Sequence, residues 1–511
     1  MELQQEPTCT TINVTLDSTD AKVLSVATKA DPSVKVAAKA PVSFPHNLSK
    51  KLGIFIAQDG RAYAIMADAG NSYALAVGSG KLNNVIRQLA LKEGITLRKN
   101  DLGDINSHLY SVAEMSGVTQ QVWYRVAKIN NGIEIDVGDV AHTRIVIQSG
   151  KVTTVTSGSA TLFWRTKSTL PLTLPAANGN LKLLNKYLNL HAINATIFLG
   201  WLTYTLASPK GSASKYVILI LEGNQGAGKS NFCRMIINLL DPNVVGIQVM
   251  PSNLKDLSIA AQNGHVLCFD NVREFNQTMA DALCIASTGG ALTARQLYSD
   301  GEQSILFLHT ALVLNGIHSF VTEADLAQRC LTIEMLPITE SDRKSDADLA
   351  VAFQCDLPEI MAGLYELTAE IMAALPKAKV TNPQRMIDFV KWLAAMEIAH
   401  GAPAGIYQDV YADILDRGQF ETVLENHLAA AVMDFTQYHV NGQWVGTSKE
   451  LLEELNVHAD AGTKRSKAWP SNPISLSKRL KPILHSLATQ GIKLTFSRCK
   501  LRTITITVGG K

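Results

Sequence analysis

The sequence lacks the features that mark secreted and metal-clustering proteins. Its 7 cysteines are an odd number, and they are widely scattered, without a CxxC pair or a Cys/His ligand spacing. This usage is typical of reduced, mostly buried thiols in a reducing compartment. The first residues, MELQQEPTCTTINVTLD, contain no basic stretch followed by an apolar run, so they are not a secretory signal. We therefore expect a cytoplasmic protein.

Long apolar runs and net charge are also scarce. The most apolar segment that could form a helix, residues 195–207, is too short to cross a bilayer, which needs about 20 residues. We interpret it as a core helix and expect no membrane partner. The formal net charge is only +2, so any basic surface that binds nucleic acid must be local. With 46% hydrophobic and 18% charged residues, the composition is that of an ordinary globular protein.

A glycine-rich motif directly follows a continuous apolar run. Residues 216–221 suit a strand buried in a parallel sheet, and a helical pattern begins after the motif Gly223-Asn224-Gln225-Gly226-Ala227-Gly228-Lys229-Ser230. In such a unit the backbone N–H groups surround phosphates, Lys229 supplies charge to the β- and γ-phosphates, and Ser230 ligates Mg²⁺. The flanking strand and helix disfavour the alternative, a chance glycine-rich turn. The motif predicts that the chain binds ATP with Mg²⁺.

Two further apolar runs end in polar side chains suited to the same site. Residues 265–270 end in Asp270, a carboxylate placed to bind Mg²⁺ at the tip of a neighbouring parallel strand. The run that begins at residue 311 ends in Asn315, a neutral side chain able to orient an attacking water near the γ-phosphate. The alternatives are a solvated aspartate and a turn-forming asparagine before a glycine.

Arg329 comes next, just before a last apolar run at residues 330–336. This order of motifs resembles AAA+ ATPases, and its compact spacing resembles superfamily 3 helicases. From about Gln121 onwards, the chain is similar to the helicase part of phage and mobile-element primase-helicases. The resemblance implies a doubly wound sheet, a ring oligomer that is a hexamer, and an Arg329 that reaches the γ-phosphate of a neighbouring subunit. The alternative for Arg329 is an ion pair with Asp325 at helical spacing.

One position departs from the family pattern. AAA+ enzymes usually carry a glutamate as catalytic base directly after the metal-binding aspartate, whereas this chain has Asn271. Because an amide cannot take a proton, either Asn271 and Asn315 only position water, or another carboxylate such as Glu222 or Glu274 serves, or turnover is slow. The sequence leaves these three alternatives open. It also shows no paired acidic DxD with a following His, which argues against primer synthesis.

A hairpin in the middle of the chain is the first candidate for DNA contact. Arg295, Gln296 and Tyr298 precede a turn at Asp300-Gly301 between extended runs, which predicts a β-hairpin. The resemblance to superfamily 3 helicases implies that this hairpin lines a central pore and grips single-stranded DNA. Arg295 could equally be a structural or inter-subunit residue.

The C-terminal segment is the second candidate. From Ala461 to Lys511 it has eleven Lys or Arg residues and no Asp or Glu, a charge distribution typical of DNA-binding surfaces. Its order of strands and helices resembles a winged helix, and we expect it to bind duplex or forked DNA. Candidate contacts are Lys478, Arg479 and Lys481 on the recognition helix and Arg498, Lys500 and Arg502 on the wing. The alternative is a solvated basic tail, which the regular spacing of Trp, Leu and Ile disfavours.

The length of 511 residues predicts roughly two to four domains. We expect a multidomain fold with an α/β phosphate-loop core of the AAA+ type. It follows a flexible arm and a β-rich domain with one helix near residues 82–94, and it precedes a helical connector and a basic winged helix. The expected boundaries are 1–50, 51–175, 176–336, 337–440 and 441–511.

Two functions fit these features. The first is an ATP-driven helicase or DNA translocase that replicates a phage or mobile element. The alternative is an ATP-switched DNA-binding regulator or defence ATPase that assembles on DNA without unwinding it. Both use the same nucleotide site, and they differ in whether ATP turnover moves a strand.

Overall fold

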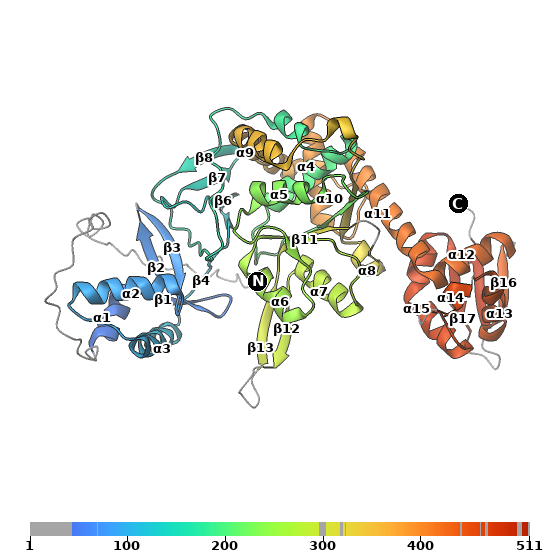
Figure 1. The fold of residues 1–511 in the computed structure, drawn as a ribbon, viewed down its shortest axis with the longest axis horizontal. Helices are drawn as coiled ribbons and strands as arrows, with labels where there is room; N and C mark the ends of the chain where they lie inside the picture. Colours follow the sequence, from blue (N-terminus) through green and yellow to red (C-terminus); the bar gives the residue numbers. More distant parts are fainter. Residues whose placement is uncertain are drawn as a thin grey trace, which may run out of the picture. The chain divides into compact units, whose positions relative to one another are not determined.

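The computed structural model describes residues 43–508, except for 69, 296–302, 317–319, 322, 440–441, 460, 466–468 and 498–502. The chain divides into two compact units (Figure 1). The first contains the residues up to Val122 together with Thr156–Leu162, and the second contains Trp123–Val155 and the residues from Phe163 onwards. In the described part of the chain, no helix combines the length and apolar character needed to cross a membrane.

The first unit packs three helices against a four-stranded sheet of order β3-β2-β1-β4. Strand β4 pairs with β1 in parallel, and the other pairs are antiparallel. Leu82, Ile86 and Ala90 recur at helical spacing on α2 and are buried in the core of this unit. The elements are α1 (Ser43–Lys51), β1 (Gly53–Ala57), β2 (Ala62–Asp68), β3 (Asn71–Ala76), α2 (Gly80–Lys92), α3 (Lys99–Ser116) and β4 (Thr119–Gln120).

Two expectations for this region are wrong. The arm predicted over residues 1–50 ends earlier, because Phe44 and Leu48 lie one helical turn apart on α1 and are buried in the core. Residues 1–42 lie outside the described residues. The region is also not a β-rich domain with a single helix, since α3 follows α2 and buries Ile105 and Leu109. The first unit is therefore mixed α and β.

A second, antiparallel sheet of order β5-β6-β7-β8 belongs to the second unit. Ile133, Ile135 and Ile145 of this sheet join the core that α4 and α5 also build, so the single domain predicted over residues 51–175 is wrong. Strands β5 and β6 are joined by a two-residue loop of Asn130 and Asn131, across which Ile129 pairs with Gly132. The strands are β5 (Val126–Ile129), β6 (Gly132–Asp136), β7 (Arg144–Gln148) and β8 (Lys151–Val155).

The centre of the second unit is a five-stranded parallel sheet of order β10-β11-β14-β9-β15. Its elements, with those around it, are η2 (Leu181–Lys186), α4 (Ala192–Leu206), β9 (Ile218–Glu222), α5 (Lys229–Leu240), β10 (Gln248–Val249), α6 (Leu254–Asn263), β11 (Val266–Asp270), α7 (Gln277–Thr288), β12 (Gly290–Arg295), β13 (Gln303–Leu308), β14 (Ala311–Asn315), α8 (Ala324–Ala327) and β15 (Cys330–Glu334). The predicted multidomain α/β class with a parallel sheet is confirmed.

Both faces of this sheet are buried. In β9, Leu219 and Leu221 join the core on the side of α5, whereas Ile218 and Ile220 join the core on the side of α6 and α7. Figure 1 shows α5 and α6 on opposite sides of β11. A strand covered on both faces needs apolar residues at every position, which explains its continuous apolar run.

Helices continue after the sheet and lead into a C-terminal subdomain. They are η3 (Glu340–Asp342), α9 (Asp346–Ala374), η4 (Leu375–Lys377), α10 (Ile387–His400) and α11 (Ile406–Glu425). The C-terminal subdomain contains α12 (His427–His439), β16 (Gln443–Thr447), α13 (Ser448–His458), α14 (Ala461–Arg465), α15 (Pro473–Thr489), β17 (Ile492–Phe496) and β18 (Thr503–Val508), with sheet order β16-β18-β17. The boundary predicted at residue 440 is wrong, because Leu428, Val432 and Phe435 of α12 are buried in this C-terminal core.

Candidate nucleotide site

The glycine-rich loop runs from the end of β9 to the first residue of α5. Gly223, Gly226 and Gly228 have φ angles of 146°, 84° and 84°, in a region that favours glycine. Lys229 begins α5 and is only 8% exposed, and its Nζ donates hydrogen bonds to the carbonyl oxygens of Gly223 at 2.6 Å and Asn224 at 3.0 Å. The loop therefore curls around the lysine ammonium, and the N-terminus of α5 follows it directly.

Electrostatics make this loop suited to an anion. Burial lowers the pKa of Lys229, and the nearby Asp270 charge opposes that shift. A phosphate beside the ammonium would favour its charged form in the same way, because an opposite charge at close range stabilises it. The backbone N–H groups at the start of α5 add to the positive field.

Asp270 ends β11 and lies beside Ser230. Contrary to the expectation of a directly neighbouring strand, β14 separates β11 from β9. The two side chains still meet, because Ser230 Oγ donates a hydrogen bond to Asp270 Oδ2 at 2.8 Å. A hydroxyl and a carboxylate oxygen this close fit the oxygen ligands that Mg²⁺ prefers, so the residues present are compatible with the ion.

Asn315 ends β14, the strand between the other two. It pairs with Leu221 of β9, so the ends of β9, β11 and β14 lie at one edge of the sheet. The Asn315 side chain is 1% exposed, and its Nδ2 lies 3.8 Å from Cys233 Sγ of α5. Its carbonyl oxygen accepts a hydrogen bond from Val272 N at 2.9 Å, which joins the segment after Asp270 to β14.

Asn271 follows Asp270 with a φ of 55°, a left-handed conformation that asparagine tolerates. Its side chain is exposed, and its backbone N–H donates to Asp270 Oδ1 at 2.8 Å. Of the alternative carboxylates, Glu222 is the last residue of β9, directly before the loop, whereas Glu274 is exposed and lies beyond the strand end. Glu222 is therefore the carboxylate closer in the chain to the phosphate loop.

Arg329 is tied to its own chain. Its Nη1 donates to Asp325 Oδ2 at 2.5 Å and to the Asp325 carbonyl oxygen at 2.6 Å. Arg385 binds the other carboxylate oxygen of Asp325 at 2.5 Å. Partial burial raises the pKa of Asp325, but the two guanidinium groups outweigh it and hold that pKa below its usual range. The ion pair considered as the alternative for Arg329 is thus present.

The position of Arg329 also separates it from the loop of its own chain. Its carbonyl oxygen accepts a hydrogen bond from Ile218 N, at the start of β9, whereas the glycine-rich loop leaves the other end of that strand. At about 3.3 Å per residue, the five-residue strand places the two ends roughly 13 Å apart. Arg329 therefore lies at the start of β9, and the glycine-rich loop lies at the opposite end of that strand.

The candidate DNA contacts fall partly within the described residues. Strands β12 and β13 form the predicted antiparallel hairpin, which extends beyond α6 and α7 in Figure 1, and the backbone of Arg295 pairs with Gln303 at its outer end. Three cations, Lys478, Arg479 and Lys481, are exposed on α15. The remaining candidates lie outside the described residues: Gln296, Tyr298, Arg498, Lys500 and Arg502.

The sequence motifs missed Arg343 and Arg385, because neither stands in a recognisable pattern. A Cβ placed on Gly226 would lie 3.2 Å from Arg343 Nη2, so this guanidinium sits against the glycine-rich loop. Only the fold brings together these two positions, which are far apart in the chain.

Buried ion pairs explain the polar residues around the second sheet. Arg125 is 3% exposed, and its Nε binds Asp241, at the end of α5, at 2.9 Å. Asp136 binds Arg144, and Arg165 Nη2 binds Asp136 at 2.6 Å. These ion pairs hold the β5–β8 sheet together and connect it to α5, so these buried charged residues have a structural role.

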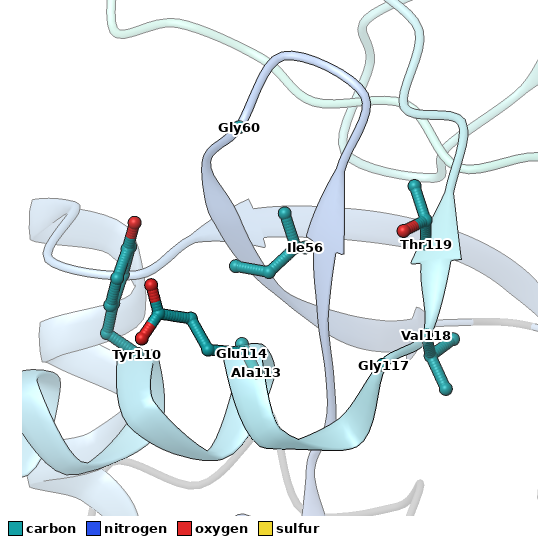
Figure 2. A pocket seen from close by; sticks show the side chains of 8 residues that line it. All are labelled: Ile56, Gly60, Tyr110, Ala113, Glu114, Gly117, Val118 and Thr119. Atoms are coloured by element: carbon teal, nitrogen blue, oxygen red, sulfur yellow. The ribbon is translucent and has the colours of Figure 1, made fainter.

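An open hollow of about 380 Å³ lies in the first unit (Figure 2). Figure 2 shows Tyr110 and Glu114 on α3 at one side, Thr119 at the other, and Ile56 between them. Glu114 is the one charged residue of its lining, which gives the hollow no positive group for a phosphate. Nothing in its lining makes it a nucleotide site.

Comparisons with known proteins point to replication proteins of mobile elements. Residues 182–417 match the family model of the actinomycete integrative conjugative element replication protein, and residues 428–511 match the model of its RepA C-terminal domain. The chain has no match among curated proteins.

Solved structures similar to this chain include two described as a helicase and as a C-terminal region. The active helicase Cch of SCCmec type IV is 12% identical, with 88% of this chain and 91% of that chain covered and a TM-score of 0.42. The apo A form of the NrS-1 C-terminal region is 13% identical, with 92% and 98% covered and a TM-score of 0.37. Both TM-scores are below 0.5.

Proposed function

We propose that this chain is an ATP-driven DNA helicase or translocase that acts in the replication of a mobile element. The observation that carries the proposal is the 2.8 Å hydrogen bond between Ser230 Oγ and Asp270 Oδ2, beside a glycine-rich loop that curls around Lys229. This is the donor set that phosphoryl-transfer enzymes use to bind a nucleotide with its metal ion. The match of residues 182–417 to a mobile-element replication family supports the biological setting.

In this proposal each residue has a separate task. Backbone N–H groups of the loop and Lys229 bind the phosphates, and Ser230 and Asp270 hold Mg²⁺. The ion, when bound, neutralises charge that develops on the transferred phosphoryl group. Asn315 and Asn271 orient the attacking water, and Glu222 is the carboxylate we assign as the base.

The proposed assembly is a ring, with six subunits as in superfamily 3 helicases. Its support is the place of Arg329, whose backbone binds the start of β9, whereas the loop leaves the other end of that strand, roughly 13 Å along it. A guanidinium at the opposite edge of the sheet can reach a γ-phosphate only if that phosphate belongs to a neighbouring subunit. Arg329 would then act as an arginine finger supplied in trans.

For the C-terminal subdomain we propose a winged helix that binds duplex or forked DNA. The support is the order of α12, β16, α13, α15, β17 and β18 and the sheet order β16-β18-β17. In the proposed winged helix, α15 would be the recognition helix. Lys478, Arg479 and Lys481 are exposed on α15. The β12–β13 hairpin is the proposed contact for single-stranded DNA.

Strand displacement from forked DNA tests this function against the ATP-switched regulator or defence ATPase. The wild-type chain is mixed with a labelled fork and ATP, and Lys229→Ala is the control. Displacement that needs ATP and disappears in Lys229→Ala supports the helicase. ATP hydrolysis and fork binding without displacement, or with release only of a bound dye, would instead establish the regulator.

A further inference from the structure

The segment that leaves β15 lies across the glycine-rich loop. A Cβ placed on Gly223 would lie 3.0 Å from the carbonyl oxygen of Met335, and one placed on Gly228 would lie 3.4 Å from Ile338 Cδ1. The Cβ of a residue at Gly226 would lie 3.2 Å from Arg343 Nη2. All three loop glycines therefore face the same stretch, residues 335–343, which we call the connector.

Both ends of the connector are anchored to the loop's own elements. At its start, Met335 N donates to the carbonyl oxygen of Glu222 at 2.8 Å. Just beyond its end, Asp346 Oδ1 accepts a hydrogen bond at 2.7 Å from Asn231 Nδ2, in the first turn of α5. The connector thus begins where the loop begins and ends where α5 begins.

Arg343 is a charged side chain on the connector that lies beside the glycine-rich loop. Its side chain is exposed, and no ion pair or hydrogen bond joins it to the residues that the structure describes. It lies against Gly226 of the glycine-rich loop, two residues before the N-cap of α5. The backbone N–H groups at a helix start form a positive field, and Lys229 adds to it. Like charges at one place are unfavourable unless an anion lies between them.

We propose that Arg343 is a phosphate ligand of the nucleotide, supplied in cis by the connector. This inference rests on the proposed ATP site and adds a second cation to it. Its planar guanidinium can donate two parallel hydrogen bonds to phosphate oxygens. The Lys229 ammonium is a compact point charge and lacks this forked geometry.

The test measures the affinity of the full chain for MgATP and MgADP with a fluorescent-nucleotide competition titration. Arg343→Ala should weaken binding of at least MgATP by about ten- to a hundredfold, the loss expected for a charge-assisted hydrogen bond. Arg343→Lys should recover part of that loss, since it keeps the charge without the fork. Lys344→Ala, which removes the adjacent exposed cation, is the matched control and should change affinity less than about twofold, in keeping with an exposed surface charge.

The outcomes separate this inference from the proposed function. If wild type binds ATP, and Arg343→Ala binds MgATP and MgADP with the same affinities as wild type, Arg343 is not a ligand and the inference is overturned. An equal loss in Lys344→Ala would also overturn it, because the effect would then be general surface charge. If wild type itself binds no nucleotide while remaining folded, the ATP site fails and the inference fails with it.

Discussion

The ion pair between Arg329 and Asp325 sets a quantitative expectation for the arginine finger. The Arg329 side chain is only 11% exposed, but the Asp325 side chain is 59% exposed. Because water screens the carboxylate, we take the stabilisation of about 0.3 to 1 kcal/mol that exposed pairs give. To reach a neighbouring subunit, Arg329 must first leave Asp325, which costs this free energy. A cost of that size lowers the rate of ATP hydrolysis by a factor of at most about five. Asp325→Asn should therefore leave ATP hydrolysis unchanged or raise it by up to about fivefold.

Arg329→Ala should behave very differently. It should leave ATP affinity nearly intact and lower the hydrolysis rate by about 10³-fold or more, as loss of a trans-acting finger does. Arg385→Ala is the matched control, because Arg385 binds the same carboxylate, and it should change the rate less than about fivefold. Steady-state phosphate release by verified oligomers measures all three variants.

Mixing experiments decide whether Arg329 acts between subunits. Lys229→Ala and Arg329→Ala proteins, each inactive alone, should recover some hydrolysis when combined, because a mixed interface joins an intact loop to an intact arginine. Wild-type hydrolysis by Arg329→Ala would refute the reasoning outright. No recovery in proven mixed oligomers would refute action in trans.

Three further outcomes follow from the structure. Asp270→Asn keeps an oxygen beside Ser230 but removes the negative charge. The rate of Mg²⁺-dependent ATP hydrolysis should therefore fall at least about a hundredfold, whereas ATP binding without Mg²⁺, measured by titration, should persist. Changing Lys478, Arg479 and Lys481 together to Ala should flatten the slope of log DNA affinity against log salt by roughly 0.9 per lost contact, and an unchanged slope would mean that α15 does not face DNA. His265 and His309 are buried, and desolvation lowers the pKa of each to about 4. Because the unfolded histidines take up protons below about pH 6.5 and the folded ones do not, the free energy of unfolding should fall between pH 6.5 and 4 by up to about 3 kcal/mol for each. Urea unfolding at pH 7, 6 and 5 measures this loss, and a stability that does not change over that range contradicts it.

The strands of the parallel sheet could be predicted from the sequence because both of their faces are buried. Residues 265–270 are apolar almost throughout, and β11 covers Val266–Asp270. The strand order could not be predicted in the same way. Nothing in the apolar runs reveals that β14 lies between β9 and β11, so Asp270 was expected on a neighbouring strand.

Long-range contacts set the other limits of prediction. Arg343 lies against Gly226, and Arg385 against Asp325, through pairings that no local spacing announces. The start of the C-terminal subdomain was placed too late for a related reason. Helix α12 follows α11 after a single residue, and only packing shows that Phe435 belongs to the C-terminal core.

Hydrolysis of MgATP by wild type and Lys229→Ala tests the central claim most directly. Lys229 Nζ donates hydrogen bonds to the carbonyl oxygens of Gly223, which is partly exposed, and Asn224, which is exposed. Because water can replace such bonds, we expect the variant to keep the wild-type melting temperature without nucleotide. The account predicts that wild type releases phosphate and that folded Lys229→Ala does not, because the charge facing the β- and γ-phosphates is gone. Wild-type ATP hydrolysis by a folded Lys229→Ala protein would contradict it.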